Sequence, residues 1–131
     1  MKGILVWVMD YIDFRFKIEM PLPSDGKLSE CLIETNCVLV EWSFEDIDDT
    51  YQKLVEIASL LPRTKVLEQT ENYWHGLCRS MIFRFPDDLE VLKLPNQKII
   101  QVRSASRFGL GDLGVNRNRV SALYRRLNEL N

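Results

Sequence analysis

The feature that most constrains the fold is a run of four strand-like segments between two helix-like ones. Residues 64–69, 73–80, 87–94 (starting at 87 or 88) and 98–104 alternate apolar and polar side chains or are rich in strand-forming residues. Thr70-Glu-Asn72 and Leu94-Pro-Asn-Gln97 supply turn chemistry between neighbouring segments. Because connections this short join antiparallel neighbours, the run predicts an antiparallel sheet.

Two segments show the period of an amphipathic helix. The first begins at Asp46 and stops at Pro62, and its apolar stripe comprises Ile47, Tyr51, Leu54, Val55, Ala58 and Leu61. Acids in its first turn suit the helix dipole and a cap, which explains them better than a metal site does. The second helix is expected from residue 115 or 116 to 130, with a stripe of Val120, Leu123, Tyr124, Leu127 and Leu130.

Residues 14–20 also alternate and predict a strand, whereas residues 4–9 fit either a strand or a short helix, and residues 37–42 form a candidate extended segment. The expected class is α+β: an antiparallel sheet of four to six strands with two helices packed on one face. A chain of 131 residues fits one domain, 1–131, in which 1–24 would be an N-terminal strand extension.

Charged side chains alternate with apolar ones along two neighbouring segments. Asp88 and Glu90 on one, and Gln101 and Arg103 on the next, should share the face away from the apolar set. His75 and Arg79 are candidates to join them. The simpler alternative is a solvent-exposed face with cross-strand ion pairs, each contributing about 0.2–1 kcal/mol to stability.

The stretch from Arg103 to Arg119 joins the last strand to the last helix and carries four arginines, three glycines and two serines. Glycines let the backbone approach a ligand, and a helix N-terminus attracts anions. Arg103, Arg107 and Arg117 are therefore expected to converge on a carboxylate or phosphate. A dense structural clamp between strand and helix is the competing interpretation, in which Asp112 and Asn116 act as caps. Arg117 and Arg119 need compensation by Asp112, Asp87, Asp88 or a bound anion, because the helix dipole disfavours cations there.

Gly109-x-Gly111-x-x-Gly114 satisfies the bare GxGxxG pattern, but the parallel βαβ setting that gives the pattern its meaning is lacking. Candidates for catalysis are His75 as a base, with Asp87, Asp88 and Glu90 as acids. Candidate nucleophiles are Ser104, Ser106 and Cys78, and no spacing links any of them to a base.

The three cysteines include no CxxC pair and accompany a single histidine, which disfavours a zinc site. No metal and no cofactor is expected. Reduced thiols are the default expectation for Cys31, Cys37 and Cys78, and a bridge between the first two would matter in an oxidising compartment.

A net charge of −2 gives no case for general nucleic-acid affinity. Residues 98–131 are basic, with 7 lysines and arginines against 2 acids, and could face an anionic ligand or the acidic remainder of the fold. Residues 4–9 are too short an apolar run to span a bilayer, so no membrane span is expected and the plain expectation is a cytoplasmic protein.

Several segments resemble the domain of unknown function 1499 family. The resemblance covers residues 25–130 and rests on Gly26–Cys31 to Val38, Leu61–Thr64, Phe83–Asp88, Val102–Arg107 and Asp112–Arg117. It implies no established activity, and it leaves plastid or membrane-associated locations open. The family's characteristic polar positions map here onto Arg79, Arg84, Asp87, Asp88, Arg103, Ser104, Ser106, Arg107, Asp112, Asn116 and Arg117.

The functional expectation is a non-catalytic domain that binds a small anionic ligand, or an acidic group of a protein partner, at the Arg-rich junction. The alternative is a small hydrolase-like enzyme that uses His75 or the Asp87/Asp88 pair beside the arginines.

Overall fold

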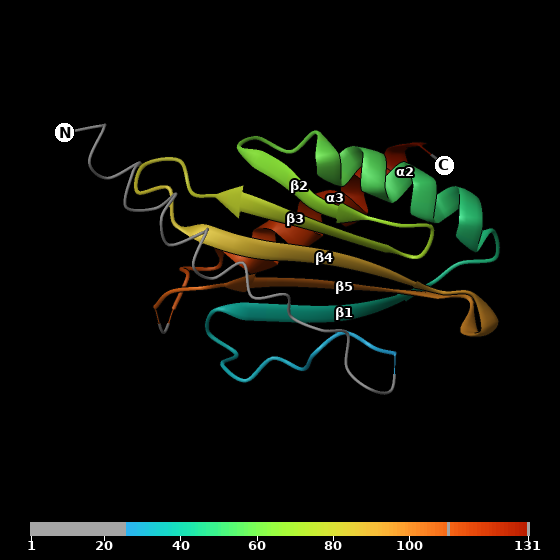
Figure 1. Ribbon diagram of the computed structural model, residues 1–131, viewed down its shortest axis with the longest axis horizontal. Helices are drawn as coiled ribbons and strands as arrows, with labels where there is room; N and C mark the ends of the chain where they lie inside the picture. The colour runs from blue at the N-terminus through green and yellow to red at the C-terminus, as the bar shows by residue number, and fades with distance from the viewer. Residues whose placement is uncertain (1–25, 110, 131) are drawn as a thin grey trace.

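The computed structural model describes residues 26–109 and 111–130, and within them the chain forms an antiparallel sheet of five strands (Figure 1). The strands are β1 (Cys37–Ser43), β2 (Thr64–Gln69), β3 (Tyr73–Arg79), β4 (Pro86–Leu94) and β5 (Ile99–Ser106). Their spatial order is β1-β5-β4-β3-β2. The expected α+β class is confirmed.

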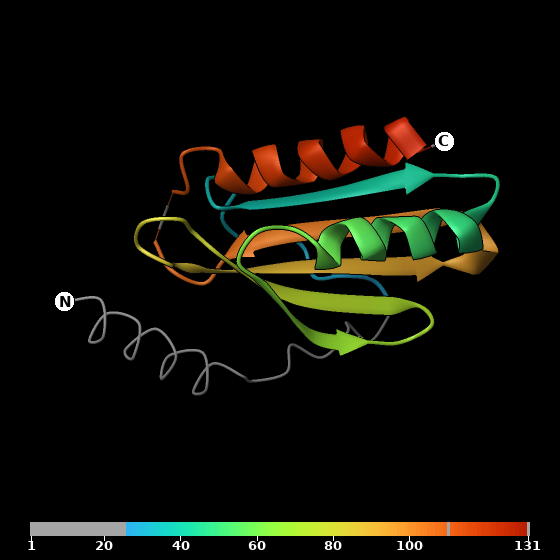
Figure 2. The ribbon, with the colours of Figure 1, turned by 90° about the horizontal axis from the view of Figure 1, so that it is seen from above.

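Two helices cover one face of this sheet (Figure 2). Helix α2 (Ile47–Ser59) is capped as expected, because the Asp46 carboxylate accepts a hydrogen bond from the Asp49 backbone N–H at 3.3 Å. Helix α3 (Val115–Leu130) runs beside β1 and β5, and a short 3-10 turn (Pro95–Gln97) links β4 to β5. None of the helices in the described ranges is long and apolar enough to cross a membrane.

The apolar core fills the space between the helices and the sheet. Its largest fully buried side chain is Trp74 of β3, and the other sheet residues in this layer include Leu89, Val91, Ile100 and Val102. The helices contribute the stripes expected from their periodicity, except that Tyr124 and Leu130 are 43% and 57% exposed. Tyr124 instead lies against the Trp42 ring at 4.8 Å between centroids, where its hydroxyl stays in reach of water.

The opposite face of the sheet carries a smaller cluster. Leu28, from the segment before β1, packs with Tyr73 and Leu92, and the Leu28 backbone N–H donates to the Gln101 side-chain oxygen at 2.8 Å. This contact ties residues 26–36 to the polar face described below.

Element boundaries differ from the expectations at a few points. Strand β5 continues to Ser106, two residues beyond the predicted end, because its last serines are bonded to α3 side chains. Strand β4 begins at Pro86 and β3 ends at Arg79, each one residue from the predicted bounds. The segment 37–42 is the edge strand β1. The strand predicted for 14–20 lies outside the described residues.

We predict that Gly76→Ala lowers the free energy of unfolding by about 1–3 kcal/mol. A Cβ atom at Gly76 would overlap the indole ring of Trp74, which is fully buried and has no room to move. Urea unfolding measures the effect, with Glu56→Ala on the exposed side of α2 as a control expected to change stability by less than about 0.5 kcal/mol. An unchanged midpoint for Gly76→Ala would contradict the core geometry.

Candidate functional site

Three ionisable side chains form a row across the sheet face opposite the helices. The Tyr73 hydroxyl of β3 donates to Glu90 Oε2 of β4 at 2.6 Å, and Arg103 Nη1 of β5 lies 3.4 Å from Glu90 Oε1. Glu90 and Arg103 are direct cross-strand partners. All three residues are buried, so the Glu90 carboxylate is shared between a phenol and a guanidinium away from bulk water.

A second group lies beside this row. His75 Nε2 is 2.7 Å from Asp88 Oδ1, and Arg107 donates to both oxygens of the same carboxylate at 2.8 Å each. The two parallel bonds from Arg107 are the strongest geometry available to an arginine and a carboxylate. Asp88 is thus held from both sides.

These contacts shift the pKa values of Asp88 and Tyr73. Burial alone would raise the pKa of Asp88, but the hydrogen bonds and charges of Arg107 and His75 outweigh it and lower that pKa to about 2. Burial and the adjacent Glu90 carboxylate raise the pKa of Tyr73 well above its usual range. Tyr73 therefore remains a neutral hydrogen-bond donor to Glu90.

Arg103 is the least satisfied arginine of this face. Its only hydrogen-bonded acid in the described chain is Glu90, at a long 3.4 Å, whereas Arg107 meets Asp88 at 2.8 Å. The Arg103 Nε atom is buried and has no hydrogen-bond partner among the described residues. A buried donor without an acceptor is costly, so this atom marks a position where an acceptor is missing.

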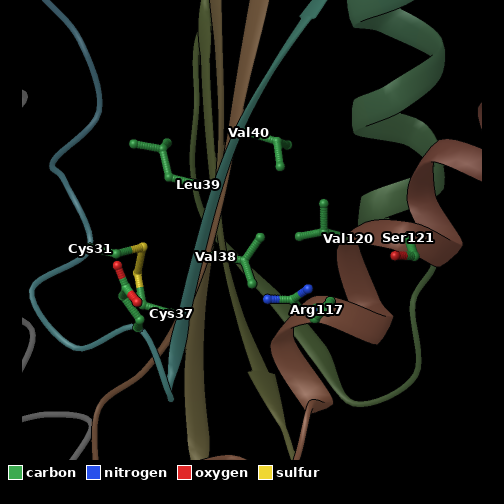
Figure 3. Close-up of a pocket in the computed structure, with 9 residues that line it drawn as sticks. Cys31, Cys37, Val38, Leu39, Val40, Arg117, Val120 and Ser121 are labelled. Carbon is green, nitrogen blue, oxygen red and sulfur yellow. A yellow bond between two sulfur atoms is a disulfide. The ribbon is translucent and has the colours of Figure 1, made fainter.

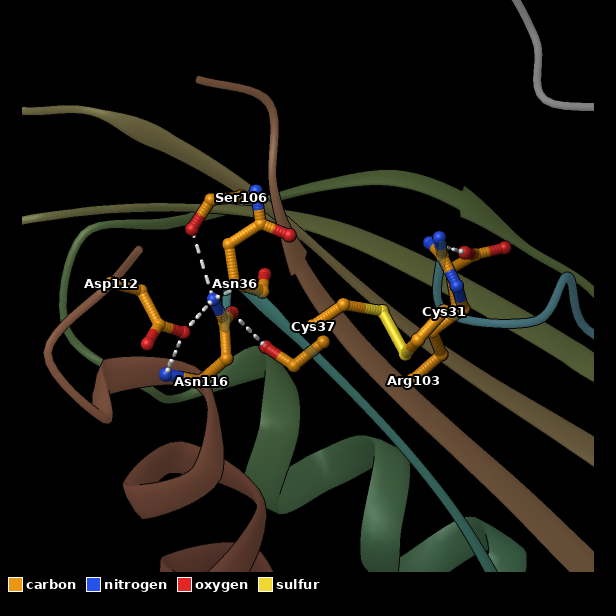
Figure 4. The surroundings of a disulfide bond; sticks show 9 residues. Cys31, Asn36, Cys37, Arg103, Ser106, Asp112 and Asn116 are labelled. Atoms are coloured by element: carbon orange, nitrogen blue, oxygen red, sulfur yellow. Dashed lines mark hydrogen bonds and ion pairs between the residues drawn. A yellow bond between two sulfur atoms is a disulfide. The ribbon is translucent and has the colours of Figure 1, made fainter. Parts of the chain in front are cut away.

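A different polar system occupies the helix side of the sheet, centred on Asn116 (Figure 4). The fully buried Asn116 amide donates to the Asn36 carbonyl at 3.1 Å, to Ser106 Oγ at 2.9 Å and to Asp112 Oδ2 at 2.6 Å. Its oxygen accepts from Ser104 Oγ at 2.7 Å. One side chain therefore joins β5, the start of α3 and the segment before β1.

Arg119 also belongs to the network around Asn116. Its positive charge lies near the start of α3, where the helix dipole disfavours it, and an acidic side chain compensates it. Its guanidinium donates to Asp87 Oδ2 at 2.9 Å and to Ser104 Oγ at 3.0 Å. Asp112 meanwhile accepts the Gly114 and Asn116 backbone N–H groups at 2.8 Å and 3.2 Å, as an N-terminal cap does. The junction between strand and helix thus has the properties of a structural clamp.

A disulfide joins Cys31 and Cys37 (Figure 4). The expectation of reduced thiols is wrong for this pair and holds for Cys78, which is free and buried. The sequence gives the spacing of the two cysteines but not the 5.5 Å between their Cα atoms, which suits a bridge. The bridged loop presents Asn36, whose amide donates to the Gly109 carbonyl at 2.6 Å, so the disulfide supports the clamp from outside.

Arg117 lies apart from the other arginines. It is exposed and borders a hollow of about 530 Å³ beside strand β1, formed together with the disulfide and with Val38, Val40 and Val120 (Figure 3). Its guanidinium makes no hydrogen bond or ion pair with the described residues.

The polar residues expected at one site are therefore distributed over separate places. The face opposite the helices holds Asp88, Arg103 and Arg107. The helix side holds Asp87, Ser104, Ser106, Asp112 and Asn116. Arg79 and Arg84 meet at the turn between β3 and β4, where Arg79 Nη1 donates to the Arg84 carbonyl at 3.1 Å. Arg103 and Arg107 share one face of the sheet, as alternation requires, but the entry into α3 places Arg117 beside β1, so the three arginines do not converge on one place.

Sequence reasoning missed two members of these networks. Tyr73 precedes His75 by two residues, so strand alternation would have placed it on the ionisable face. Asn36 gives no such signal, because its partners lie far along the chain.

The geometry separates the candidate catalytic groups. His75 and Asp88 lie on the face opposite the helices, whereas Ser104 and Ser106 bond to Asn116 on the other. Burial raises the pKa of the Cys78 thiol, which disfavours a thiolate nucleophile. No group of acids, histidines and cysteines within the described residues has the arrangement of a metal site.

Comparison with known proteins gives a family but no activity. A family model described as "Protein of unknown function (DUF1499)" matches residues 27–127, which span all five strands and most of α3. A search of proteins with curated functions finds no significant match.

We predict that Asn116→Ala lowers the free energy of unfolding by about 1–3 kcal/mol, because Ser104, Ser106 and Arg119 lose a buried partner. Asp112→Ala should cost about 0.5–2 kcal/mol as a lost cap. Chemical denaturation measures both, and the exposed neighbour Asn118→Ala is the matched control. Equal stability of Asn116→Ala and Asn118→Ala would show that the clamp is not structural.

We also predict a loss of stability in acid that depends on Asp88. A carboxyl whose pKa is lowered to about 2 on folding contributes stability above its unfolded pKa of about 4, and this is lost as pH falls through the folded value. The contribution is about 2 kcal/mol. The stability of Asp88→Asn should therefore fall less than that of the wild type between about pH 4 and 2. Parallel pH profiles for the two proteins would refute this.

Proposed function

The chain belongs to the DUF1499 family, and from that premise we propose that its domain binds a small anionic ligand at Arg103, on the sheet face opposite the helices. The ligand supplies a carboxylate or phosphate oxygen to the Arg103 guanidinium. The domain acts as a binding module and performs no covalent chemistry at this place.

One observation carries the proposal: Arg103 Nε is buried without a hydrogen-bond partner among the described residues. Arg103 is only 8% exposed, so water replaces the missing acceptor poorly. A folded protein that keeps a buried donor in this condition normally has a reason, such as a ligand that completes the site.

The contacts around Arg103 favour the exchange of its partner Glu90 for a ligand anion. Glu90 already accepts a 2.6 Å bond from Tyr73, so the carboxylate stays partly satisfied if Arg103 turns toward a ligand. The 3.4 Å contact that Arg103 would give up is weak by ordinary geometry. A carboxylate or phosphate can bond two N–H groups of a guanidinium at once, which improves on that contact.

Asp88 and His75 give this face a second polar pair, which supports recognition and does not supply a nucleophile. The Asp88 carboxylate is occupied by Arg107 and His75, and the serines expected as nucleophiles bond to Asn116 on the other side of the sheet. The hydrolase-like alternative therefore has less support than anion binding.

Calorimetric titration of the wild-type protein with inorganic phosphate, citrate and acetate tests the proposal. We expect at least one of these anions to bind, and Arg103→Gln to weaken it by about 10–100-fold, the effect of losing a charged hydrogen bond. Arg103→Lys keeps the charge but loses the planar fork, and should bind with intermediate affinity.

Arg125→Gln, on the exposed part of α3, is the matched control for lost positive charge. Circular dichroism establishes that each variant is folded. Equal affinity of Arg103→Gln and Arg125→Gln, or no binding by the wild type, would overturn the proposal.

A further inference from the structure

Strand β1 is an edge of the sheet, and the hydrogen bonds at its two ends show which of its backbone groups face β5 and which face outward. The Ser106 N–H donates to the Asn36 carbonyl at 2.9 Å, and the Phe44 N–H donates to the Lys98 carbonyl at 3.0 Å. Hydrogen-bonded pairs alternate along an antiparallel ladder. The backbone groups of the even-numbered residues between Asn36 and Phe44 therefore bond to β5. The backbone N–H and C=O groups of Cys37, Leu39 and Glu41 therefore point away from the sheet.

The first four residues of β1 lack three of the features that usually protect a sheet edge, and Glu41 is the charged residue of the strand. Proteins normally blunt a sheet edge with proline, a bulge or charged side chains. The pairing of β1 with β5 continues without a register shift over seven residues, and Cys37–Val40 contains neither proline nor charge. The sheet has no further strand beside β1 in the described chain.

A trough lies along this edge (Figure 3). Its floor is Val38–Val40, one wall is α3 with Arg117, Val120 and Ser121, and the other wall is the Cys31–Cys37 bridge with Glu34. We call this hollow of about 530 Å³ the β1 trough. Its open edge and apolar lining match what an extended peptide needs: main-chain partners and pockets for alternate side chains.

The walls argue against a second copy of the chain as the occupant. Two sheets that join edge to edge must bring their edge strands to about 4.8 Å. Here the edge is bordered on both sides, and each copy would carry both walls into the contact. A single extended strand carries no such walls into the contact.

The charges on the walls indicate the chemistry of that strand. Arg117 is an exposed cation in the first turn of α3, where the dipole disfavours it, so a carboxylate beside it is favourable. Glu34 is an exposed acid on the opposite wall. Because successive side chains of a strand point to opposite sides, adjacent acidic and basic residues in the peptide would meet Arg117 and Glu34 respectively.

We propose that the β1 trough binds an extended peptide of a partner protein as a sixth, antiparallel strand next to β1. The peptide has apolar side chains and an adjacent acidic–basic pair that pairs with Arg117 and Glu34. This site is separate from Arg103 and stands whether or not that residue binds an anion.

Selection from a random seven-residue peptide library displayed on phage, against the full chain with its disulfide intact, tests the proposal. We expect enriched peptides to combine alternating apolar residues with an acidic–basic pair. Synthetic copies of them should bind Arg117→Glu at least about tenfold more weakly than the wild type. Arg117→Glu is expected to fold, since an acid suits the start of a helix.

Two further measurements make the result specific. Methylating the backbone nitrogen of the bound peptide should abolish binding at every second residue and spare the residues between, as one-sided strand pairing requires. The double variant Glu34→Lys/Arg117→Glu should prefer peptides with the pair reversed, while Arg125→Glu should behave like the wild type.

Several results would overturn the proposal: no enrichment, equal binding by Arg117→Glu, or uniform sensitivity to methylation. Concentration-dependent dimerisation of the wild type that Arg117→Glu abolishes would also overturn it, since a second copy would then occupy the edge. Sedimentation of both proteins measures that outcome.

Discussion

The pairing of β4 with β5 determines which polar side chains of these two strands face away from the helices. Glu90 pairs with Arg103, and Val91 pairs with Val102 on the next position. Because alternate residues point to opposite faces, a slip of one residue would bring Arg103 into the apolar layer beneath the helices and expel Val102. The apolar core therefore enforces the register, and the register in turn creates the buried ionisable row.

The same constraint produces two polar systems of unequal completeness. Asn116 uses both its amide and its oxygen on five side-chain or backbone partners, and it ties strand, helix and disulfide loop together. Arg103 keeps one long contact and one buried donor without an acceptor among the described residues. The first system stabilises the fold, and the second is the proposed ligand site.

Much of the fold could be predicted from local pattern. Alternation placed Glu90 and Arg103 on one face, and periodicity identified the buried stripes of both helices. The sequence does not show that Arg117 lies apart from Arg103 and Arg107, because the path of the chain between β5 and α3 decides where Arg117 points. The contacts of Asn36 depend on a carbonyl and an amide 73 and 80 positions away, so no local signal announces them.

The most direct test of the central claim is an NMR titration that follows the side-chain Nε–H signals of the arginines as inorganic phosphate or citrate is added to the wild-type protein. The account predicts that the Arg103 signal shifts and becomes protected from exchange with water. The Arg119 signal should stay in place, because the guanidinium of Arg119 is held in the clamp through Nη1 and Nη2. An unchanged Arg103 signal at saturating anion would contradict it.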